Sequence, residues 1–515
     1  MISSVCLERP GRWRAAGVAS LLLLAVLPAV PLFWRTLSSG ELASLGGAYG
    51  GALWNSVVVA SLVGMTTLVV GLPAGMLASL YDFPGRRILL ALLVLPVLVP
   101  SFLWAIGWSS LAAHLGPAVT VVLSGYTGCV VVFFAEMFPL VLLTSYAATI
   151  GLSGSQIDAA RLAGGEKAVL WHACRYVAVP AGLAAGLGGV LTLSDPGPGQ
   201  ILGLQTAASE ILTSFSALYD FNLAGRQCLV LAALVLLSAM PLVYLAAPRL
   251  ATEIMGRQSR TFRRLGNQRI AIVAGVGFTL LALCAVIAPL VGLVLPLLDG
   301  VEFRRTWSEV TRTGFNTVLY AGMAGVVAAL MGLLLAFFVG RSRRLRTVCL
   351  GVCLTLFSLP PALGAFGIID LATNASAWAD PLLRSQATVG LALGLRFFPV
   401  AAILGLRAWG SMSASWAQAA GIHAVPLGTY VRKVVIPFLL PTGGMAVLLV
   451  ALLATADVGT VLLLHPPGKT SLPLAVFTVM ANAPESLVAS LCLAYVGLAA
   501  GLLIAAWTIV TRVLR

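Results

Sequence analysis

Apolar runs of about 20 residues follow one another along almost the whole chain and are separated by short polar stretches. A run of this length can cross the hydrocarbon core of a bilayer as a helix. The pattern predicts an all-α membrane protein with about 12 transmembrane helices. The predicted spans lie near residues 15–33, 51–80, 88–111, 119–149, 179–194, 224–247, 270–298, 313–340, 347–371, 386–407, 438–464 and 487–511.

The start of the chain and its composition agree with this class. Three arginines precede the first run, which is longer than the core of a signal peptide, so we expect an uncleaved first helix. The 515 residues are 60% hydrophobic and only 9% charged, whereas a soluble domain carries about a quarter charged residues. The eight cysteines form no CxxC pair and the four histidines are scattered, so no metal site is predicted.

The basic residues predict the topology. If the termini and every second loop lie on one side, that side holds 23 of the 31 lysines and arginines. Cytoplasmic loops collect basic residues, so both termini are expected in the cytoplasm. The net charge of +14 is therefore read as a sign of topology. Nucleic-acid binding is the poorer interpretation, because the basic residues are spread over separate short loops.

Several landmarks recur at a nearly constant spacing, which indicates an internal repeat. Two parallel six-helix repeats are predicted, 1–247 and 270–515, joined by an arginine-rich cytoplasmic linker, 248–269. The pathway of a transporter built in this way is expected between the halves. The matched landmarks are Asn55-Ser56-Val57 with Asn316-Thr317-Val318, Leu95-Pro96 with Leu359-Pro360, Phe138-Pro139 with Phe398-Pro399, and Asp195 with Asp457.

Two polar, helix-forming segments are the most informative of the repeated features. Both fall in predicted cytoplasmic loops between the fourth and fifth span of a half, and each ends at a proline that suits the first turn of a helix. Paired alanines let the backbone of a partner come close, and a glycine permits a sharp turn. The first contains Asp158, Ala159, Ala160 and Gly164 and runs to Pro180; the second contains Gln418, Ala419, Ala420 and Ala424 and runs to Pro437.

These segments resemble the cytoplasmic loop of the permease subunits of binding-protein-dependent ABC importers. The family's loop begins Glu-Ala-Ala, has a glycine four residues after the second alanine, and has a proline thirteen residues beyond that glycine. This chain departs from the pattern in carrying Asp158 and Gln418 for the glutamate and Ala424 for one glycine, and in placing Pro180 three residues late. The fused six-plus-six arrangement looks most like the ferric-iron branch, with thiamine and aminoalkylphosphonate permeases nearby.

The resemblance implies a fold like that of type I ABC importer permeases, in a bacterial inner membrane. It implies that two copies of a cytoplasmic ABC ATPase dock on the two loops and that a periplasmic solute-binding protein delivers the cargo. Ferric iron is the preferred cargo, and thiamine or an aminoalkylphosphonate is the alternative. The permease itself would be no enzyme and would need no cofactor, because ATP is bound by the partner subunit. Gly468-Lys469-Thr470 ends like a phosphate-binding loop, but Leu463 stands where its first glycine is required.

Four ionisable residues are candidates for the translocation pathway: Glu136, Arg396, Asp195 and Asp457. Glu136 and Arg396 lie 260 residues apart near the middle of predicted spans, each three residues before a proline. Charges at that depth normally face the interior of the bundle, water or a partner. One hypothesis is that Glu136 and Arg396 pair across the interface between the halves. The alternative is that each faces a separate polar cavity or a backbone carbonyl.

Two other classes of function stay open. A secondary transporter with a six-plus-six repeat would carry its own coupling-ion site, usually charged residues in several spans, and few are found. A membrane enzyme or scaffold would show a catalytic constellation, and no Ser-His-Asp, HExxH or clustered carboxylate pair is evident. The outer segments 195–223 and 465–486 are predicted to be long polar loops that receive a binding protein. Their candidate residues are Asp195, Glu210, Asp220, His465, Lys469 and Glu485.

Overall fold

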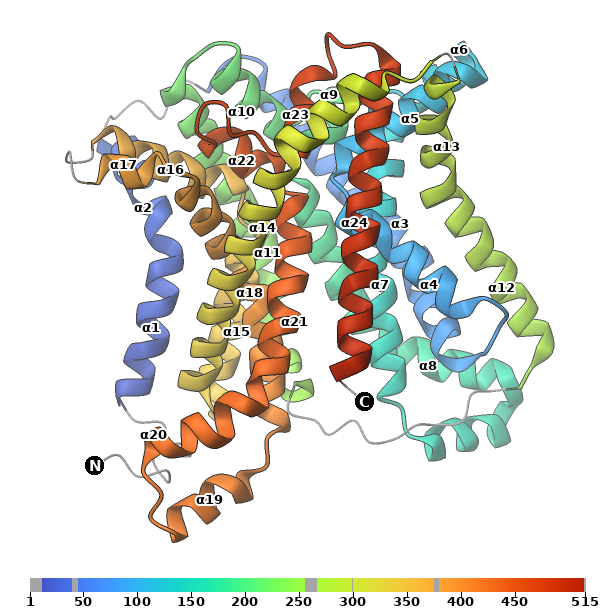
Figure 1. Cartoon of the computed structure of the whole chain (residues 1–515). Coiled ribbons are helices and arrows are strands. Elements are labelled where there is room, and N and C mark those ends of the chain that lie inside the picture. Colours follow the sequence, from blue (N-terminus) through green and yellow to red (C-terminus); the bar gives the residue numbers. More distant parts are fainter. Residues whose placement is uncertain (1–11, 39–44, 255–265, 299, 375–378, 514–515) are drawn as a thin grey trace.

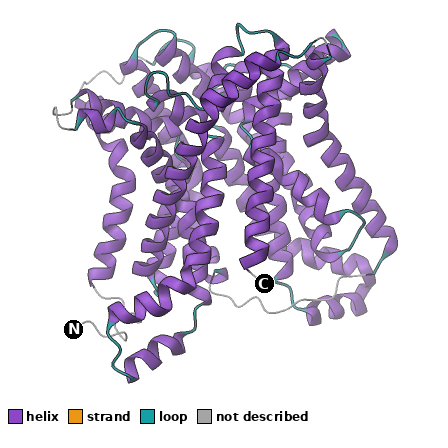
Figure 2. Ribbon diagram, in the orientation of Figure 1, coloured by secondary structure: helices purple, strands orange, loops and turns teal. Residues whose placement is uncertain are grey.

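The computed structural model describes residues 12–38, 45–254, 266–298, 300–374 and 379–513. Within these ranges every regular element is a helix, as Figure 2 shows. The first part of the chain comprises α1 Arg12–Val26, α2 Val30–Ser38, α3 Tyr49–Leu80, α4 Arg86–Val94, α5 Ser101–Leu115, α6 Pro117–Leu123, α7 Gly125–Ile150, α8 Gly154–Thr192, α9 Gly197–Leu202, α10 Ala207–Ser216 and α11 Phe221–Glu253.

The second part begins after residue 265. It comprises α12 Gln268–Ala282, α13 Ala288–Val294, α14 Phe303–Val339, α15 Arg343–Ser358, α16 Pro361–Thr373, α17 Asp380–Leu383, α18 Gln386–Ser411, α19 Ala414–Ile422, α20 Leu427–Tyr430, α21 Ile436–Thr455, α22 Val458–Leu464, α23 Leu472–Val479 and α24 Glu485–Val513. Short 3-10 or π turns join α1 to α2, α12 to α13 and α20 to α21 into continuous rods. Most of the predicted linker, residues 255–265, lies outside the described residues.

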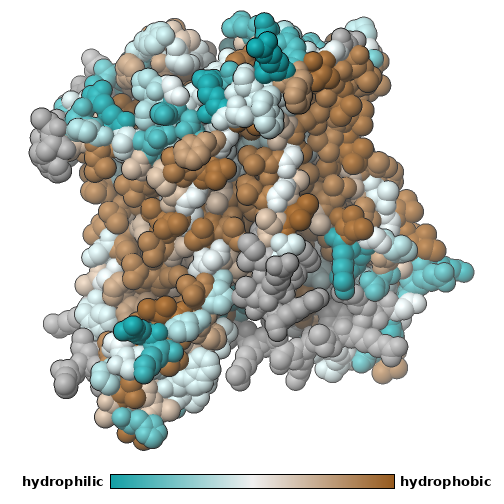
Figure 3. Space-filling view, in the orientation of Figure 1, coloured by the Kyte–Doolittle hydropathy of each residue, from teal (hydrophilic) through white to brown (hydrophobic). Residues whose placement is uncertain are grey.

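The prediction of an all-helical, multi-span membrane protein is confirmed. In the described ranges ten helices, or rods of joined helices, are long and apolar enough to cross a membrane, and two bent pairs bring the number to twelve. Figure 3 shows a broad apolar band between two more polar ends. Large apolar side chains on that surface, such as Val69, Leu237 and Val273, are more than two-thirds exposed. Such a surface suits lipid chains better than water.

Both bent pairs owe their bend to a proline. The α4–α5 pair bends by 105° and the α15–α16 pair by 83°. Proline disfavours the helical conformation in the residue before it, and Val99 and Leu359 are both extended, directly before Pro100 and Pro360. The two bends are thus separated by the same interval as Glu136 and Arg396. Matching Leu359-Pro360 with Leu95-Pro96, as the sequence suggested, is therefore wrong by one turn.

The outer segments are more ordered than their predicted description as long polar loops. Residues 197–216 form α9 and α10, and residues 458–479 form α22 and α23. Ala207 and Ile211 in the first segment and Leu474 and Val476 in the second are almost fully buried. The two segments are packed, broken helices at one end of the bundle, at the top of Figure 1.

The helices at the ends of each predicted half pack on the other half. The core built on α14, α18 and α21 includes Val18 of α1 and Ala251 of α11. The core built on α3, α5 and α7 includes Phe278 of α12 and Tyr495 of α24. The crossing of α5 and α13 is close, because a Cβ on Gly107 would lie 2.4 Å from the carbonyl oxygen of Pro289. The two halves of the sequence therefore share their cores.

Candidate functional site

Two short helices project from the lower end of the bundle in Figure 1. The first projecting loop, residues 154–165, is the beginning of α8, which breaks at Gly164 and Gly165 before the long helix continues. The second projecting loop, residues 414–426, contains α19 and the turn that leads to α20. These are the two segments that the sequence singled out, and both lie at the same end of the molecule.

The turn of each projecting loop contains one residue with left-handed backbone. In the first loop it is Gly165, with φ 64° and ψ −155°. In the second it is Ala424, with φ 51°, one of two non-glycine residues with positive φ in the described chain. Gly164, which the family pattern marks, has an extended φ of −164°. The glycine pattern thus identifies the turn correctly, but in the first loop the left-handed position falls one residue later.

The two projecting loops present similar surfaces. Asp158 and Ala159 in the first, and Gln418 and Ala419 in the second, are exposed. The second alanines face the body of the protein: Ala160 is half-buried, and Ala420 is 8% exposed. Two aliphatic side chains 260 residues apart point outward instead, with Leu162 90% and Ile422 82% exposed. Sequence reasoning did not identify Leu162 and Ile422, although their shared offset was a signal that could have done so.

A hydrogen-bonded cluster holds the first projecting loop against the bundle. The Tyr81 hydroxyl donates to Glu166 Oε2 at 2.5 Å, and Arg161 Nη2 lies 2.6 Å from Glu166 Oε1. Burial, followed by the hydrogen bond to Glu166, raises the pKa of Tyr81 above its usual value. The phenol is therefore a donor at neutral pH, and its hydrogen bond ties α8, just after the projecting loop, to the residue that follows α3.

The four candidate pathway residues lie in the interior of the bundle. Arg396 of α18 forms an ion pair with Asp457, its Nε 2.6 Å from Asp457 Oδ2. No acceptor lies in line with the Nε–H, so the contact is electrostatic rather than an aligned hydrogen bond. Asp457 also caps α22, since Thr460 donates to it from its backbone nitrogen at 2.9 Å and from its hydroxyl at 3.0 Å. The predicted pairing of Arg396 with Glu136 is therefore wrong.

Glu136 and Asp195 interact electrostatically in the other half of the bundle. Asp195 follows α8 and accepts two hydrogen bonds, from the Ser101 hydroxyl at 2.7 Å and from the backbone nitrogen of Gly197 at 2.8 Å. Glu136 interacts electrostatically with Asp195, and Asp195 interacts with Asp457 and Arg396. The direct contact among the four is the Arg396–Asp457 ion pair. Sequence spacing identified them but gave the wrong partner, because residues at matching positions of two repeats need not touch.

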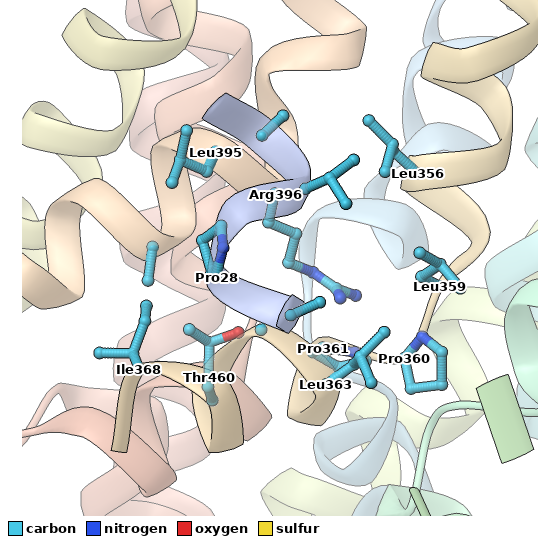
Figure 4. Close-up of a pocket in the computed structure, with 16 residues that line it drawn as sticks. Pro28, Leu356, Leu359, Pro360, Pro361, Leu363, Ile368, Leu395, Arg396 and Thr460 are labelled. Carbon is cyan, nitrogen blue, oxygen red and sulfur yellow. The ribbon is translucent and has the colours of Figure 1, made fainter. Parts of the chain in front are cut away.

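A cavity of about 90 Å³ lies beside Arg396. Figure 4 shows the Arg396 side chain extending into it, toward the bend at Pro360 and Pro361. The lining residues are apolar except for Arg396 and Thr460 and come from α1, α15, α16, α18 and α22, together with the turn after α1. The guanidinium therefore has free space on one side and its carboxylate partner on another.

The recurring Asn-Ser and Asn-Thr pairs anchor the outer segments. Asn55 Nδ2 donates to the carbonyl of Gln205 at 2.9 Å, and Ser56 Oγ accepts from the backbone nitrogen of Ala207 at 2.9 Å. The same two bonds occur between Asn316 and the carbonyl of Thr470, at 3.1 Å, and between Thr317 and the nitrogen of Leu472, at 2.8 Å. The motif was predicted as a landmark of the repeat; its role in anchoring these segments emerges only from the structure.

The other outer candidates do not converge on one site. Asp220 caps α11 by accepting from the backbone nitrogen of Leu223 at 2.9 Å. His465 Nδ1 lies 3.1 Å from the carbonyl of Val461, and the carbonyl of Lys469 accepts from the Tyr320 hydroxyl. Glu210 and Glu485 lie in the first turns of α10 and α24. Among the described residues, no group of three or more histidine, cysteine or acidic side chains is placed to hold a metal ion.

Comparisons with known proteins assign this chain to no family. A scan against protein-family models, a search of curated proteins and a search of solved structures give no match for this chain.

Proposed function

We propose that this chain is the membrane-spanning permease subunit of a binding-protein-dependent ABC importer, located in a bacterial inner membrane with both termini in the cytoplasm. The observation that carries the proposal is the pair of projecting loops at one end of the bundle, each with an exposed aliphatic side chain at the same point of its short helix. An apolar side chain held out in this way suits a hydrophobic groove on a partner. Two copies of a cytoplasmic ABC ATPase would each receive one loop.

A repeat of two parallel six-helix units underlies this proposal. It is supported by the two proline bends, by the two pairs of outer anchors and by the two projecting loops, all of which recur at nearly the same interval along the chain. In a protein with this repeat the pathway lies between the halves, where Glu136, Asp195, Asp457 and Arg396 would line it. A periplasmic binding protein would deliver the cargo to the end formed by α9, α10, α22 and α23.

The preferred cargo is ferric iron, with thiamine or an aminoalkylphosphonate as the alternative; this choice rests on the sequence resemblance. The permease would hold no cofactor, because the ATPase binds ATP, and no nucleic acid is expected among its partners. Membrane lipid would cover the apolar band.

The proposal is tested by purifying the tagged full-length chain from its native membranes and measuring ATP hydrolysis in the purified complex. Burying a leucine side chain contributes about 1.5–3 kcal/mol. Leu162→Asp and Ile422→Asp should therefore each weaken retention of the ATPase about tenfold or more. Leu218→Asp is the matched control, because Leu218 is also an exposed leucine but closely follows α10, which lies at the opposite end of the bundle. Absence of ATPase activity, or equal retention by all three variants, would contradict the proposal.

The intramembrane charge cluster favours a second candidate, a secondary transporter, since such proteins place ionisable residues at the midplane. The two candidates differ in their energy source. Uptake into liposomes by the chain alone, driven by a proton or sodium gradient, would support the secondary transporter. Uptake that requires the ATPase and ATP would support the importer.

A further inference from the structure

Positions 136 and 396 occupy matching places in two long helices but carry opposite charges. Each is three residues before a proline in a long helix, Glu136 in α7 and Arg396 in α18. Each lies near an aspartate that joins a long helix to a short one, Asp195 between α8 and α9 and Asp457 between α21 and α22. Only the second position holds a cation.

The cation at position 396 ties a short helix to the bundle. Arg396 contacts Asp457 at 2.6 Å, and Asp457 in turn holds the first turn of α22 through Thr460. Asp457 is 8% exposed. An ion pair shielded from water is screened little by salt, so it connects α18 firmly to the start of α22.

The corresponding tie between α7 and the start of α9 is missing. Both oxygens of Asp195 accept hydrogen bonds from Ser101 and Gly197, neither of which belongs to α7. Glu136 Oε2 is shielded from solvent and accepts no hydrogen bond from any residue that the structure describes. Glu136 and Asp195 are both acids, so position 136 offers no cation that could pair with Asp195 as Arg396 pairs with Asp457. The hydrogen bonds of Asp195 thus tie the first short segment to α5, and its contact with α7 is apolar, with Leu202 packed beside Gly128.

We infer that position 136 is the vacant half of a repeated ion-pair site, so that the segment 193–204 separates from α7 more easily than the segment 456–466 separates from α18. The inference rests on the two-unit repeat of the proposed function and adds an asymmetry to it. The segment 193–204 forms the moving wall of the pathway, and the segment 456–466 forms the fixed wall. Arg396 is a positioning residue for the fixed wall.

Hydrogen exchange on the full-length chain, purified in detergent without any partner, tests this inference. In the unmodified protein the amides of 193–204 should exchange faster than those of 456–466. Arg396→Gln should speed exchange in 456–466 about tenfold or more, and by much more than in 193–204, because removing one member of a buried pair leaves the other uncompensated. Equal exchange of the two segments in the unmodified protein would overturn the inference.

A transplanted arginine provides the sharper test. Glu136→Arg should form with Asp195 the pair that Arg396 forms with Asp457, and should slow exchange in 193–204 several-fold. Glu136→Gln is the matched control, since it removes the carboxyl group without adding a cation, and it should slow exchange less. If Glu136→Arg speeds exchange or equals Glu136→Gln, the inference fails. Should Glu136→Arg not fold, the Arg396→Gln result still decides. No ATPase or cargo takes part, so a failed permease assignment would leave these results intact.

Discussion

The left-handed turns of the projecting loops make a quantitative prediction about backbone strain. Gly165 has φ 64° and ψ −155°, a region open almost only to glycine, where other residues pay about 1–3 kcal/mol. A Cβ added to Gly165 would meet no atom within 4 Å. Gly165→Ala therefore tests the backbone conformation without any steric clash, and it should destabilise the first projecting loop by that amount.

The opposite change at Ala424 should have the opposite sign. Ala424 has φ 51°, and the left-handed conformation costs a non-glycine residue about 1–2 kcal/mol. Glycine loses about 0.5–1 kcal/mol more backbone entropy on folding than alanine. Ala424→Gly should thus stabilise the second projecting loop by about 0.5–1 kcal/mol.

Hydrogen exchange of 154–163 and 414–422 in the full-length chain measures both effects as changes in local opening. A cost of about 1–3 kcal/mol corresponds to roughly 5- to 150-fold faster exchange in the first loop. The second loop should exchange about two- to fivefold more slowly. Gly154→Ala is the matched control, because Gly154 lies in the same loop with open space and without a positive φ. Equal effects of Gly165→Ala and Gly154→Ala, or faster exchange after Ala424→Gly, would refute the reasoning.

Three further predictions follow from single contacts. Arg14→Gln should lower the thermal stability of the protein, and Arg14→Lys should recover part of the loss. The Arg14 guanidinium donates to two carbonyls at the end of α14, and hydrogen bonds from charged groups contribute about 1.5–3 kcal/mol each. Thr317→Val should cost about 1–3 kcal/mol by leaving the buried backbone nitrogen of Leu472 without its acceptor, and Thr317→Ser should not; equal unfolding midpoints for the two variants would contradict this. Cysteines placed at the exposed Ser155 and Ser308 should be labelled by an impermeant reagent from opposite sides of the membrane, with Ser155 on the cytoplasmic side; labelling from the same side would reject the topology.

Burial makes some positions unsuitable for tests of docking and topology. Replacing Ala160 or Ala420 with aspartate would disturb the packing of the projecting loop itself, because Ala420 is 8% exposed and Ala160 is half-buried. The outward-facing Leu162 and Ile422 avoid that ambiguity. Ser471 is a poor site for a topology label, since it is 5% exposed, and Ser259 lies outside the described residues.

Hydropathy located most of the spans, because a bilayer-crossing helix leaves a long apolar run whatever its neighbours are. It did not separate short apolar helices from them: the predicted span 119–149 combines α6 with α7, and 438–464 combines α21 with α22. The first predicted span, 15–33, falls inside the rod Trp13–Thr36, and the second, 51–80, inside α3. Hydropathy did not predict the burial of the outer segments, 195–223 and 465–486. Short helices such as α9 and α23 are covered by tertiary packing. The sequence of α9, Gly-Pro-Gly-Gln-Ile-Leu, resembles a loop, and that of α23 is apolar but too short to cross a membrane.

The constant interval between matching positions identified which residues matter but not which of them touch. It gave Glu136 and Arg396 as matching positions, and proximity does not follow from that. The partner of Arg396 is Asp457, further along the chain at the start of a short helix whose packing the sequence does not reveal. In the projecting loops, likewise, the pattern found the turn, while the direction of each side chain depended on how the short helix lies against the bundle.

The contact between Arg14 and the end of α14 also has a consequence for biosynthesis. Its acceptor carbonyls, on Phe337 and Phe338, come 323 and 324 residues later in the chain. At about 5–20 residues per second, a ribosome needs roughly 15–65 s to reach them. During that time α1 is already in the membrane, and the helix on which it will pack has not yet been made. α1 must therefore wait in the bilayer for its partner, and a chaperone or an insertase has a long interval in which to hold it.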